Sequence, residues 1–399
     1  MTDYQVLVIG PRRGLIEVLR ARRIPFSVWQ EKRLYRVDPP HLTLTAPFSS
    51  SITRIREQIR RSFPGQRFTH VIAGTEAGVM AASVARRLLG ARPSSTVTSS
   101  RCRDKFLMKQ HLSGFGIPMT RFMADTGDLS AEEVFAVLGD PLVRKWRKSS
   151  GGRGIEYLHS GQAFQTGNSQ CLLERFVDAP EASIESFIGN GTVRFTSITG
   201  YEVKGHTNYV PAQLEEGMLT LLRDLNTRVI EALGIPWGMT HLEVYLTPGG
   251  PLFGEIALRP PGGYIMNALQ HAWEFNPWEA FVAMELGEEF TFPQQPAAWA
   301  AAEILHPGPG TVTAVRGKQQ VLSHEGVREF RIKVKAGDQV EARSALSQDA
   351  GFVVHVSDTA DKRQALHDLM MSTLAIDIAS PRPESAPVPA PHGLPGRPS

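Results

Sequence analysis

The sequence contains only two cysteines, Cys102 and Cys171, among its 399 residues. Two thiols with no CxxC pair exclude a disulfide framework and give no support to a zinc or iron–sulfur centre. So little cysteine is typical of a protein from a reducing compartment, and the chain shows no leader-like beginning, so we expect a cytoplasmic protein. An uncharged apolar run of roughly 18 residues is also absent, so we expect no membrane partner.

A strong excess of charge of either sign is absent as well. The 43 Lys and Arg residues nearly balance the 40 Asp and Glu residues, which leaves a formal net charge of +3. A charge so close to zero provides no wide basic surface for a nucleic-acid backbone, so we expect no nucleic-acid partner. The length allows two or three domains of roughly 100 to 200 residues each.

The first part of the chain alternates strand-like and helix-like segments. An apolar run at residues 4–10 is followed by helical spacing at 14–21, and a second strand at 69–74 precedes an alanine-rich helix at 79–89. Alternation of this kind predicts a parallel sheet and an α/β fold class.

The first turn lacks the glycine pattern of a dinucleotide site. Arg12 stands where the second glycine of GxGxxG would let the backbone approach a pyrophosphate. A nicotinamide dehydrogenase is therefore disfavoured, and we interpret this sheet as a scaffold or substrate platform. The pair Arg12–Arg13 either meets an anionic substrate or is solvated.

Periodicity and turn residues predict the later elements. We expect one helix within residues 100–118 and a closing amphipathic helix at 359–374, capped by Asp358 or Thr359. The remaining segments are strands at 142–145 and 171–177, a helix at 217–233, β structure at 312–356 and a proline-rich tail from residue 380.

Two lysines in the middle of the chain are the first candidates for chemistry. Lys105 stands near the start of a helix, and Lys145 closes a buried strand that runs into the glycine-rich loop Ser149–Gly154. Such a loop can place an ammonium and several backbone N–H groups around a polyphosphate, because glycine has no Cβ to keep the phosphate away. A lysine in the position of Lys105 is ordinarily solvated when it is considered alone, and the glycine-rich loop alone could be a flexible hairpin tip.

Two pairs of carboxylates follow. Glu174 and Glu181 lie on either side of the end of a predicted strand. Considered alone, this pattern is more typical of an edge strand with a solvated turn than of a binding site. Glu243 and Glu255 lie on two strands joined by a Pro-Gly-Gly-Pro turn, where they can face each other. Opposed like charges call for a cation between them, and hard oxygen ligands suit Mg²⁺; the alternative is exposed carboxylates on an outer face.

In this order, these signals resemble the ATP-grasp superfamily, specifically its carboxylate–amine ligases of the D-alanine–D-alanine ligase and L-amino-acid (dipeptide) ligase type. The resemblance covers about residues 60–380. It implies an ATP-grasp fold of the α/β (α+β) class, with an N-terminal Rossmann-like pre-ATP-grasp domain and a β-rich C-terminal element. The implied domains are 1–100 (pre-ATP-grasp), 101–175 (first ATP-grasp subdomain with the lid loop), 176–300 (second subdomain with the metal site), 301–379 (C-terminal element with the closing helix) and 380–399 (disordered tail).

The resemblance also implies roles for individual residues. Glu243 and Glu255 would bind Mg²⁺, with Mn²⁺ as an alternative, and Arg259 with the Gly262 N–H would stabilise a tetrahedral intermediate. Lys145 is both a catalytic and an ATP-binding candidate. The full ATP-binding set is Lys105, Lys145, Ser149, Ser150, Gly151, Gly152, Gly154, Glu174, Arg175, Phe176, Val177 and Glu181, with the segment from Glu174 to Val177 at the adenine and Glu181 at the ribose. The substrate candidates are Glu76, His206, Arg259 and Gly263.

The sequence departs from the family pattern in three places. Trp146 replaces a proline after the strand lysine, and Ala257 stands where many members have a metal-binding asparagine. Around Lys204–Ala212 the family's acid and histidine are replaced by Gly205 and Asn208, so His206 could equally be a core or surface histidine.

The function implied by the resemblance is an ATP-dependent ligase that joins a small-molecule carboxylate, expected to be an amino acid, to an amine through an acyl phosphate. The alternatives are transfer to a carrier-protein thiol or a purine-pathway amine, and a non-catalytic ATP-binding module, which the alanine at position 257 would favour. A homodimer is consistent with the family.

Overall fold

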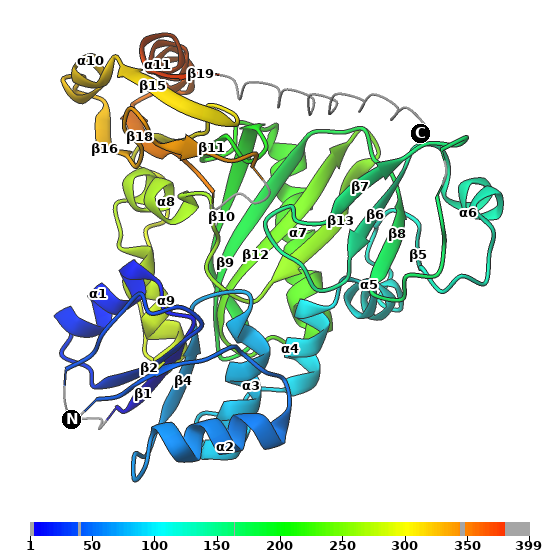
Figure 1. Ribbon diagram of the computed structural model, residues 1–399, viewed down its shortest axis with the longest axis vertical. Helices are drawn as coiled ribbons and strands as arrows, with labels where there is room; N and C mark the ends of the chain where they lie inside the picture. The colour runs from blue at the N-terminus through cyan, green and yellow to red at the C-terminus, as the bar shows by residue number, and fades with distance from the viewer. Residues whose placement is uncertain (1–3, 39–40, 163, 344–347, 380–399) are drawn as a thin grey trace, which may run out of the picture.

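The computed structural model describes residues 4–38, 41–162, 164–343 and 348–379. The expected proline-rich tail at 380–399 lies outside the described residues. The chain begins in an N-terminal layer, continues through the large central sheet with a smaller lobe beside it, and ends in an element on the opposite side from the N-terminal layer (Figure 1). Within the described residues, no helix has both the length and the apolar character needed to cross a membrane.

The N-terminal layer is a parallel sheet in the order β3–β2–β1–β4, as the alternating pattern predicts. All four residues of the central strand β1 are buried, because a parallel sheet is covered by helices on its faces. The elements are β1 (Val6–Ile9), α1 (Arg13–Ala21), β2 (Phe26–Gln30), β3 (Thr43–Thr45), α2 (Ile52–Ser62), β4 (His70–Ala73) and α3 (Gly78–Leu89).

The helix expected within residues 100–118 is present as α5 (Lys105–Ser113), and a second helix, α4 (Thr96–Arg103), which was not expected, comes directly before it. The two helices meet at Asp104. The backbone of Asp104 is extended, and its buried side chain accepts hydrogen bonds from Phe106 N and Leu107 N. Aspartate is a strong N-cap because its carboxylate satisfies free N–H groups at a helix start. This cap makes Lys105 the first residue of α5.

The smaller lobe is an antiparallel sheet in the order β5–β8–β6–β7. Its helix starts with a capping box in which Ser130 and Glu133 bond to each other's backbone N–H. The glycine-rich loop joins the two strands at one edge of this sheet. The elements are β5 (Phe122–Ala124), α6 (Ala131–Leu138), β6 (Leu142–Trp146), β7 (Ile155–Leu158) and β8 (Cys171–Arg175).

The central sheet has eight strands in the order β13–β12–β9–β10–β11–β14–β18–β16. A predicted hairpin forms its first edge, and the predicted helix at 217–233 is present as α7, whose buried side chains pack with those of the sheet in one core cluster. The elements up to residue 286 are β9 (Glu181–Gly189), β10 (Thr192–Val203), β11 (Thr207–Val210), α7 (Glu216–Leu233), β12 (Gly238–Thr247), β13 (Gly250–Ala257), α8 (Ile265–Trp273) and α9 (Pro277–Leu286).

The C-terminal element completes the central sheet and adds a three-stranded sheet in the order β17–β15–β19. The closing helix α11 starts behind Thr359, whose side chain accepts from Lys362 N. The boundary expected between residues 300 and 301 falls inside β14, and the expected division into domains stays a prediction. The elements are β14 (Trp299–Leu305), β15 (Gly310–Arg316), α10 (Lys318–Leu322), β16 (Val327–Ile332), β17 (Gln339–Val340), β18 (Gly351–Ser357), α11 (Ala360–Thr373) and β19 (Ala375–Ala379).

Candidate active site

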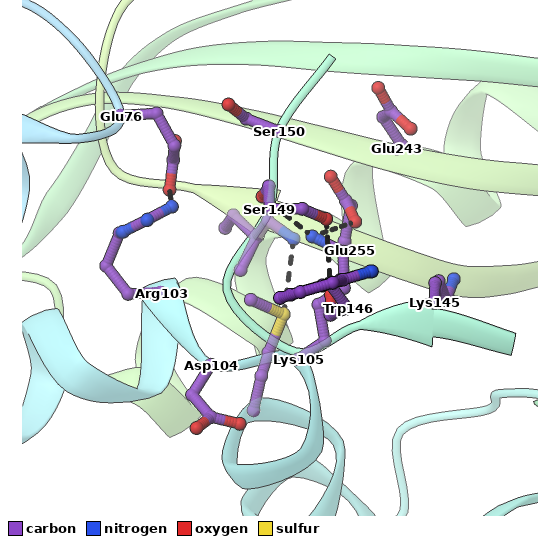
Figure 2. A network of polar contacts seen from close by, with 12 residues as sticks. Glu76, Arg103, Asp104, Lys105, Lys145, Trp146, Ser149, Ser150, Glu243 and Glu255 are labelled. Atoms are coloured by element: carbon purple, nitrogen blue, oxygen red, sulfur yellow. Dashed lines mark hydrogen bonds and ion pairs between the residues drawn. The ribbon is translucent and has the colours of Figure 1, made fainter. Parts of the chain in front are cut away.

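Lys105 joins three parts of the chain at the candidate site. Its Nζ lies 2.8 Å from Glu255 Oε2 on β13 and donates to the carbonyl oxygen of Ser149 in the glycine-rich loop, at 3.2 Å (Figure 2). The helix start is fixed to the same loop, because Asp104 binds the guanidinium of Arg147 through both carboxylate oxygens at 2.9 Å. Lys105, the loop and the hairpin are therefore brought together as the sequence predicts.

The glycine-rich loop depends on glycine for its shape. Gly151, Gly152 and Gly154 have φ angles of +66°, +77° and +69°, a region that side chains with a Cβ rarely adopt. A Cβ added to Gly154 would lie 2.2 Å from Trp146 Cδ1, so the indole packs directly on this glycine. The tryptophan that departs from the family pattern thus packs against the last glycine of the loop.

We expect Gly154→Ala to raise the KM for ATP roughly tenfold, because the added methyl group pushes the loop off the Trp146 ring and misplaces its N–H groups. Steady-state kinetics over a range of ATP concentrations measures this. Gly65→Ala is the matched control, since Gly65 also has a positive φ, +72°, but a Cβ there meets no described atom within 4 Å. An equal KM change in the two variants would contradict the packing role of Trp146.

Lys145 is held by a buried carboxylate that it shares with a second lysine. Glu174 contacts Lys145 Nζ and lies 2.9 Å from Lys109 Nζ, and all three side chains are at most 9% exposed. Burial alone would raise the pKa of Glu174, but Lys109 and Lys145 outweigh it and hold that pKa below its usual range. Burial opposes the charge of Lys145 too, yet Glu174 raises its pKa above the ordinary value. For Lys109, burial dominates and the pKa is lowered.

Sequence reasoning did not select Lys109. The available signal was helical spacing, because a residue four positions after Lys105 lies on the same face of α5.

The segment predicted to bind adenine lies at the end of β8. Arg175 is the last residue of the strand, and Phe176 and Val177 follow it, both half-buried. The Phe176 ring meets the edge of Tyr157 on β7, with centroids 5.8 Å apart. The carboxylate of Glu174 is directed to Lys109 and Lys145. Adenine binding by this segment would therefore use the backbone and the apolar side chains of Phe176 and Val177.

Glu243 and Glu255 are directly paired in the register of β12 and β13, as the hairpin predicts. Glu243 Oε2 lies 3.0 Å from Lys204 Nζ, and the same ammonium contacts Glu181. Burial opposes ionisation of Glu243, but Lys204 and a neighbouring histidine keep its pKa well below the usual range. Burial raises the pKa of Glu181.

That histidine, His241, lies between two carboxylates. Its Nδ1 is 2.8 Å from the fully buried Glu185, and its Nε2 is 3.4 Å from Glu243 Oε1. Burial disfavours the charged ring, but the two glutamates raise the pKa of His241 to about 9. Sequence reasoning missed His241, Glu185 and Lys204; period-two alternation along β12 places His241 on the same face as Glu243 and was the usable signal.

The carboxylate pair fits a divalent cation by its donor set. Both glutamates already contact cationic groups, Lys105 at Glu255 and Lys204 at Glu243. The described residues contain no cluster of three or more His, Cys, Asp or Glu side chains arranged to hold a metal. Two carboxylates therefore suit Mg²⁺, which usually keeps water and phosphate oxygens in its shell, better than a metal enclosed by protein ligands.

A second cluster surrounds Glu76, next to the end of β4. The carboxylate of Glu76 binds Arg103 Nη1 at 2.5 Å and Arg259 Nε at 2.9 Å. Burial would raise the pKa of Glu76, but Arg259, Arg103 and, more weakly, Lys105 lower it. The structure thus brings together two predicted substrate residues, Glu76 and Arg259, and places them within electrostatic reach of Lys105. Arg103 was not predicted.

The two arginines of the first turn have different environments. Arg13 is exposed and pairs with Glu17, as a solvated residue would. Arg12 instead donates to the carbonyl oxygens of Pro260 and Pro261, at 3.0 and 2.6 Å, and stacks on Trp278. Burial, followed by the nearby Arg259, lowers the pKa of Arg12 to about 9.

The glycines after Arg259 form a turn that leads into α8. Gly262 O accepts from Ile265 N, and Gly263 O accepts from Asn208 Nδ2 at 2.6 Å. His206 is exposed in the turn between β10 and β11, where its Nε2 lies 3.3 Å from Arg343 Nη1. The substrate role expected for His206 stays a prediction, since its ring contacts the C-terminal element and not Glu76 or Arg259.

Residues 303–379 match the family model of the L-amino acid ligase C-terminal domain 2. Over 275 residues the chain is 24% identical to the uncharacterised protein y4rH of Sinorhizobium fredii, a match covering 64% of this chain and 57% of that protein. It is 22% identical over 333 residues to the L-arginine-specific L-amino acid ligase of Bacillus subtilis, covering 78% of this chain and 80% of the relative.

The solved structure of an L-amino acid ligase from Bacillus licheniformis superposes with a TM-score of 0.78 at 18% identity, covering 95% of this chain and 99% of that one. A structural likeness at this identity establishes the fold, and the predicted ATP-grasp fold is confirmed. The predicted resemblance to L-amino-acid ligases is confirmed as well, by the family model and by the relative from Bacillus subtilis.

Proposed function

We propose that this protein is an ATP-dependent ligase that joins the carboxylate of one amino acid to the amine of another, releasing ADP and phosphate. The observation that carries the proposal is the convergence of Lys105, the glycine-rich loop and the paired glutamates, with the Glu76–Arg259 pair beside them. The likeness to L-amino-acid ligases supports the same reaction class.

In the first step, an oxygen of the donor carboxylate attacks the γ-phosphorus of ATP. The bond from that phosphorus to the β–γ bridging oxygen breaks, so that ADP departs and the donor carboxylate becomes an acyl phosphate. Lys105, Lys145 and the loop N–H groups neutralise the charge on the phosphates and position them for in-line transfer. Mg²⁺ held by Glu243 and Glu255 would supply further charge neutralisation at the phosphate oxygens.

In the second step, the amine of the acceptor attacks the acyl carbon. The carbon–oxygen bond to phosphate then breaks, so that the acceptor ammonium and the acyl phosphate give an amide, hydrogen phosphate and one proton released to solvent. Arg259 and the Gly262 N–H stabilise the negative oxygen of the tetrahedral intermediate. Glu76 keeps the Arg259 guanidinium in place through its Nε.

Acyl phosphates hydrolyse readily, so the site must exclude water between the two steps. The loop at Ser149–Gly154 is suited to this task because its second half is exposed, it is rich in positive-φ glycines, and it is connected to Lys105 through Ser149 O. Closure of the loop over bound ATP would cover the intermediate.

The test is phosphate release by purified protein with ATP, Mg²⁺ and pairs from an amino-acid panel, with the product identified by mass spectrometry. At least one pair should give equimolar ADP, phosphate and a condensed product one water lighter than its parts. If no pair releases phosphate, and Glu255→Gln behaves like the wild type, the proposal fails. A thioester on a carrier protein or an amide with a purine-pathway amine would instead identify those acceptors. The homodimer and the cytoplasmic location remain predictions.

A further inference from the structure

Tyr264 has a backbone conformation that is unfavourable for its residue type. It directly follows Gly262 and Gly263 and is the N-cap residue of α8, with φ +56° and ψ +18°, in the left-handed region. For a bulky L-residue this region is rare and sterically unfavourable. Such strain persists only where the surroundings enforce it, which makes the contacts of Tyr264 informative.

The C-terminal element supplies the contacts that hold Tyr264. Its ring stacks on Phe352 of β18, with centroids 3.9 Å apart and planes 18° apart. Its hydroxyl donates to Asp349 at 3.2 Å and accepts from Lys333 Nζ at 2.9 Å, and Lys333 and Asp349 form an ion pair at 2.7 Å. We name Tyr264, Phe352, Asp349 and Lys333 the C-terminal clamp.

The turn before Tyr264 is held from two more sides. Arg12 of the N-terminal layer binds the carbonyl oxygens of Pro260 and Pro261, and Asn208 of the central sheet binds that of Gly263. A Cβ built on Gly262 meets no described atom within 4 Å, so the backbone there borders open space. These hydrogen bonds to the neighbouring carbonyl oxygens fix the backbone that carries the Gly262 N–H, and a fixed donor is what a preorganised oxyanion site requires.

We propose that Tyr264 is a positioning residue for the second chemical step, and that the C-terminal clamp keeps the Gly262 N–H aligned with Arg259. This inference rests on the proposed ligase function. Residues 303–379, which match the L-amino acid ligase C-terminal domain 2, would then have a role in amide formation. The first step should not depend on the clamp, because phosphoryl transfer uses Lys105, Lys145 and the glycine-rich loop.

The two steps can be measured separately in Tyr264→Phe and Asp349→Asn. Tyr264→Phe keeps the stacked ring and removes only the hydroxyl, so the fold should be preserved. Acyl phosphate formation is followed with the donor amino acid alone, by migration of ¹⁸O from the β–γ bridge of ATP to a non-bridging β position. Amide formation is followed with both amino acids. Tyr4→Phe, in the N-terminal layer, is the control.

We expect amide formation to fall about tenfold in both clamp variants while the isotope exchange stays within about threefold of wild type. Parallel loss of both activities, or an unchanged amide rate, would overturn the inference. Hydrogen exchange of the peptide covering residues 259–268 tests the clamp without catalysis. Its amides should exchange several times faster in Tyr264→Phe than in wild type, and equal rates would refute the clamp even if no amino-acid pair reacted. Failure of the wild type to make any amide counts against the proposed function instead.

Discussion

Glu255→Gln is expected to lower the rate of amide formation at least about a hundredfold. The substitution removes one of two opposed carboxylates and the ion-pair partner of Lys105, so the phosphate site loses a cation ligand and the anchor of its lysine. The concentration of Mg²⁺ at half-maximal rate should rise at the same time. Initial rates over a magnesium titration measure both effects.

Glu57→Gln is the matched control for this experiment, since Glu57 pairs with Arg61 on the exposed face of α2. The control should retain wild-type rate and magnesium dependence. If Glu255→Gln lowered the rate without changing the magnesium dependence, the carboxylate would serve Lys105 alone and the assignment as a metal ligand would be wrong.

Lys145→Met and Lys109→Met are expected to have different consequences although both lysines bind Glu174. Lys145 lies at the end of β6, next to the glycine-rich loop, and its loss should weaken ADP binding by about 10- to 100-fold, the value of a charged hydrogen bond. Lys109 is 1% exposed, so its loss leaves buried charge poorly compensated and should lower the free energy of unfolding by about 3 kcal/mol.

Calorimetric titration with ADP and denaturant unfolding separate the two effects, with the exposed Lys362→Met as a control. Lys109→Met should bind ADP within a few-fold of wild type once folded. Similar losses of affinity in the two variants would instead give Lys109 a direct place at the nucleotide.

The hairpin of the candidate site was predictable because its information is local. A Pro-Gly-Gly-Pro turn joins β12 and β13 and sets their register as far as Val244, and a shift of one residue at Gly254 then places Glu243 opposite Glu255. The two strands of the first βα units were predictable for the same reason. The break between α4 and α5 was less visible, because only the capping carboxylate of Asp104 distinguishes two helices from one.

Residues that act across long sequence separations could not be found this way. Arg12 is partly kept from solvent by its hydrogen bonds to the carbonyl oxygens of Pro260 and Pro261. These residues lie about 250 positions away in the sequence, and no local sequence pattern links them to Arg12. Only the family resemblance suggested that Glu76 and Arg259 lie near the substrate. The periodicity of the two segments that contain them does not show that the two side chains meet. Lys204 likewise becomes part of the site only because β10 pairs with β9, which begins at Glu181.

The continuity of the central sheet has a consequence for dissecting this protein. The strand β14, in which the matched C-terminal region begins, pairs with β11 through residues 300–303 on one side and with β18 along its whole length on the other. Removing residues 303–379 would cut β14 after Ala302 and take away β18, which leaves residues 299–302 as a sheet edge with free N–H and C=O groups, the kind of edge that recruits strands from other molecules. The C-terminal region is therefore not a detachable module, and shortened versions of the protein should aggregate before they can report on its role.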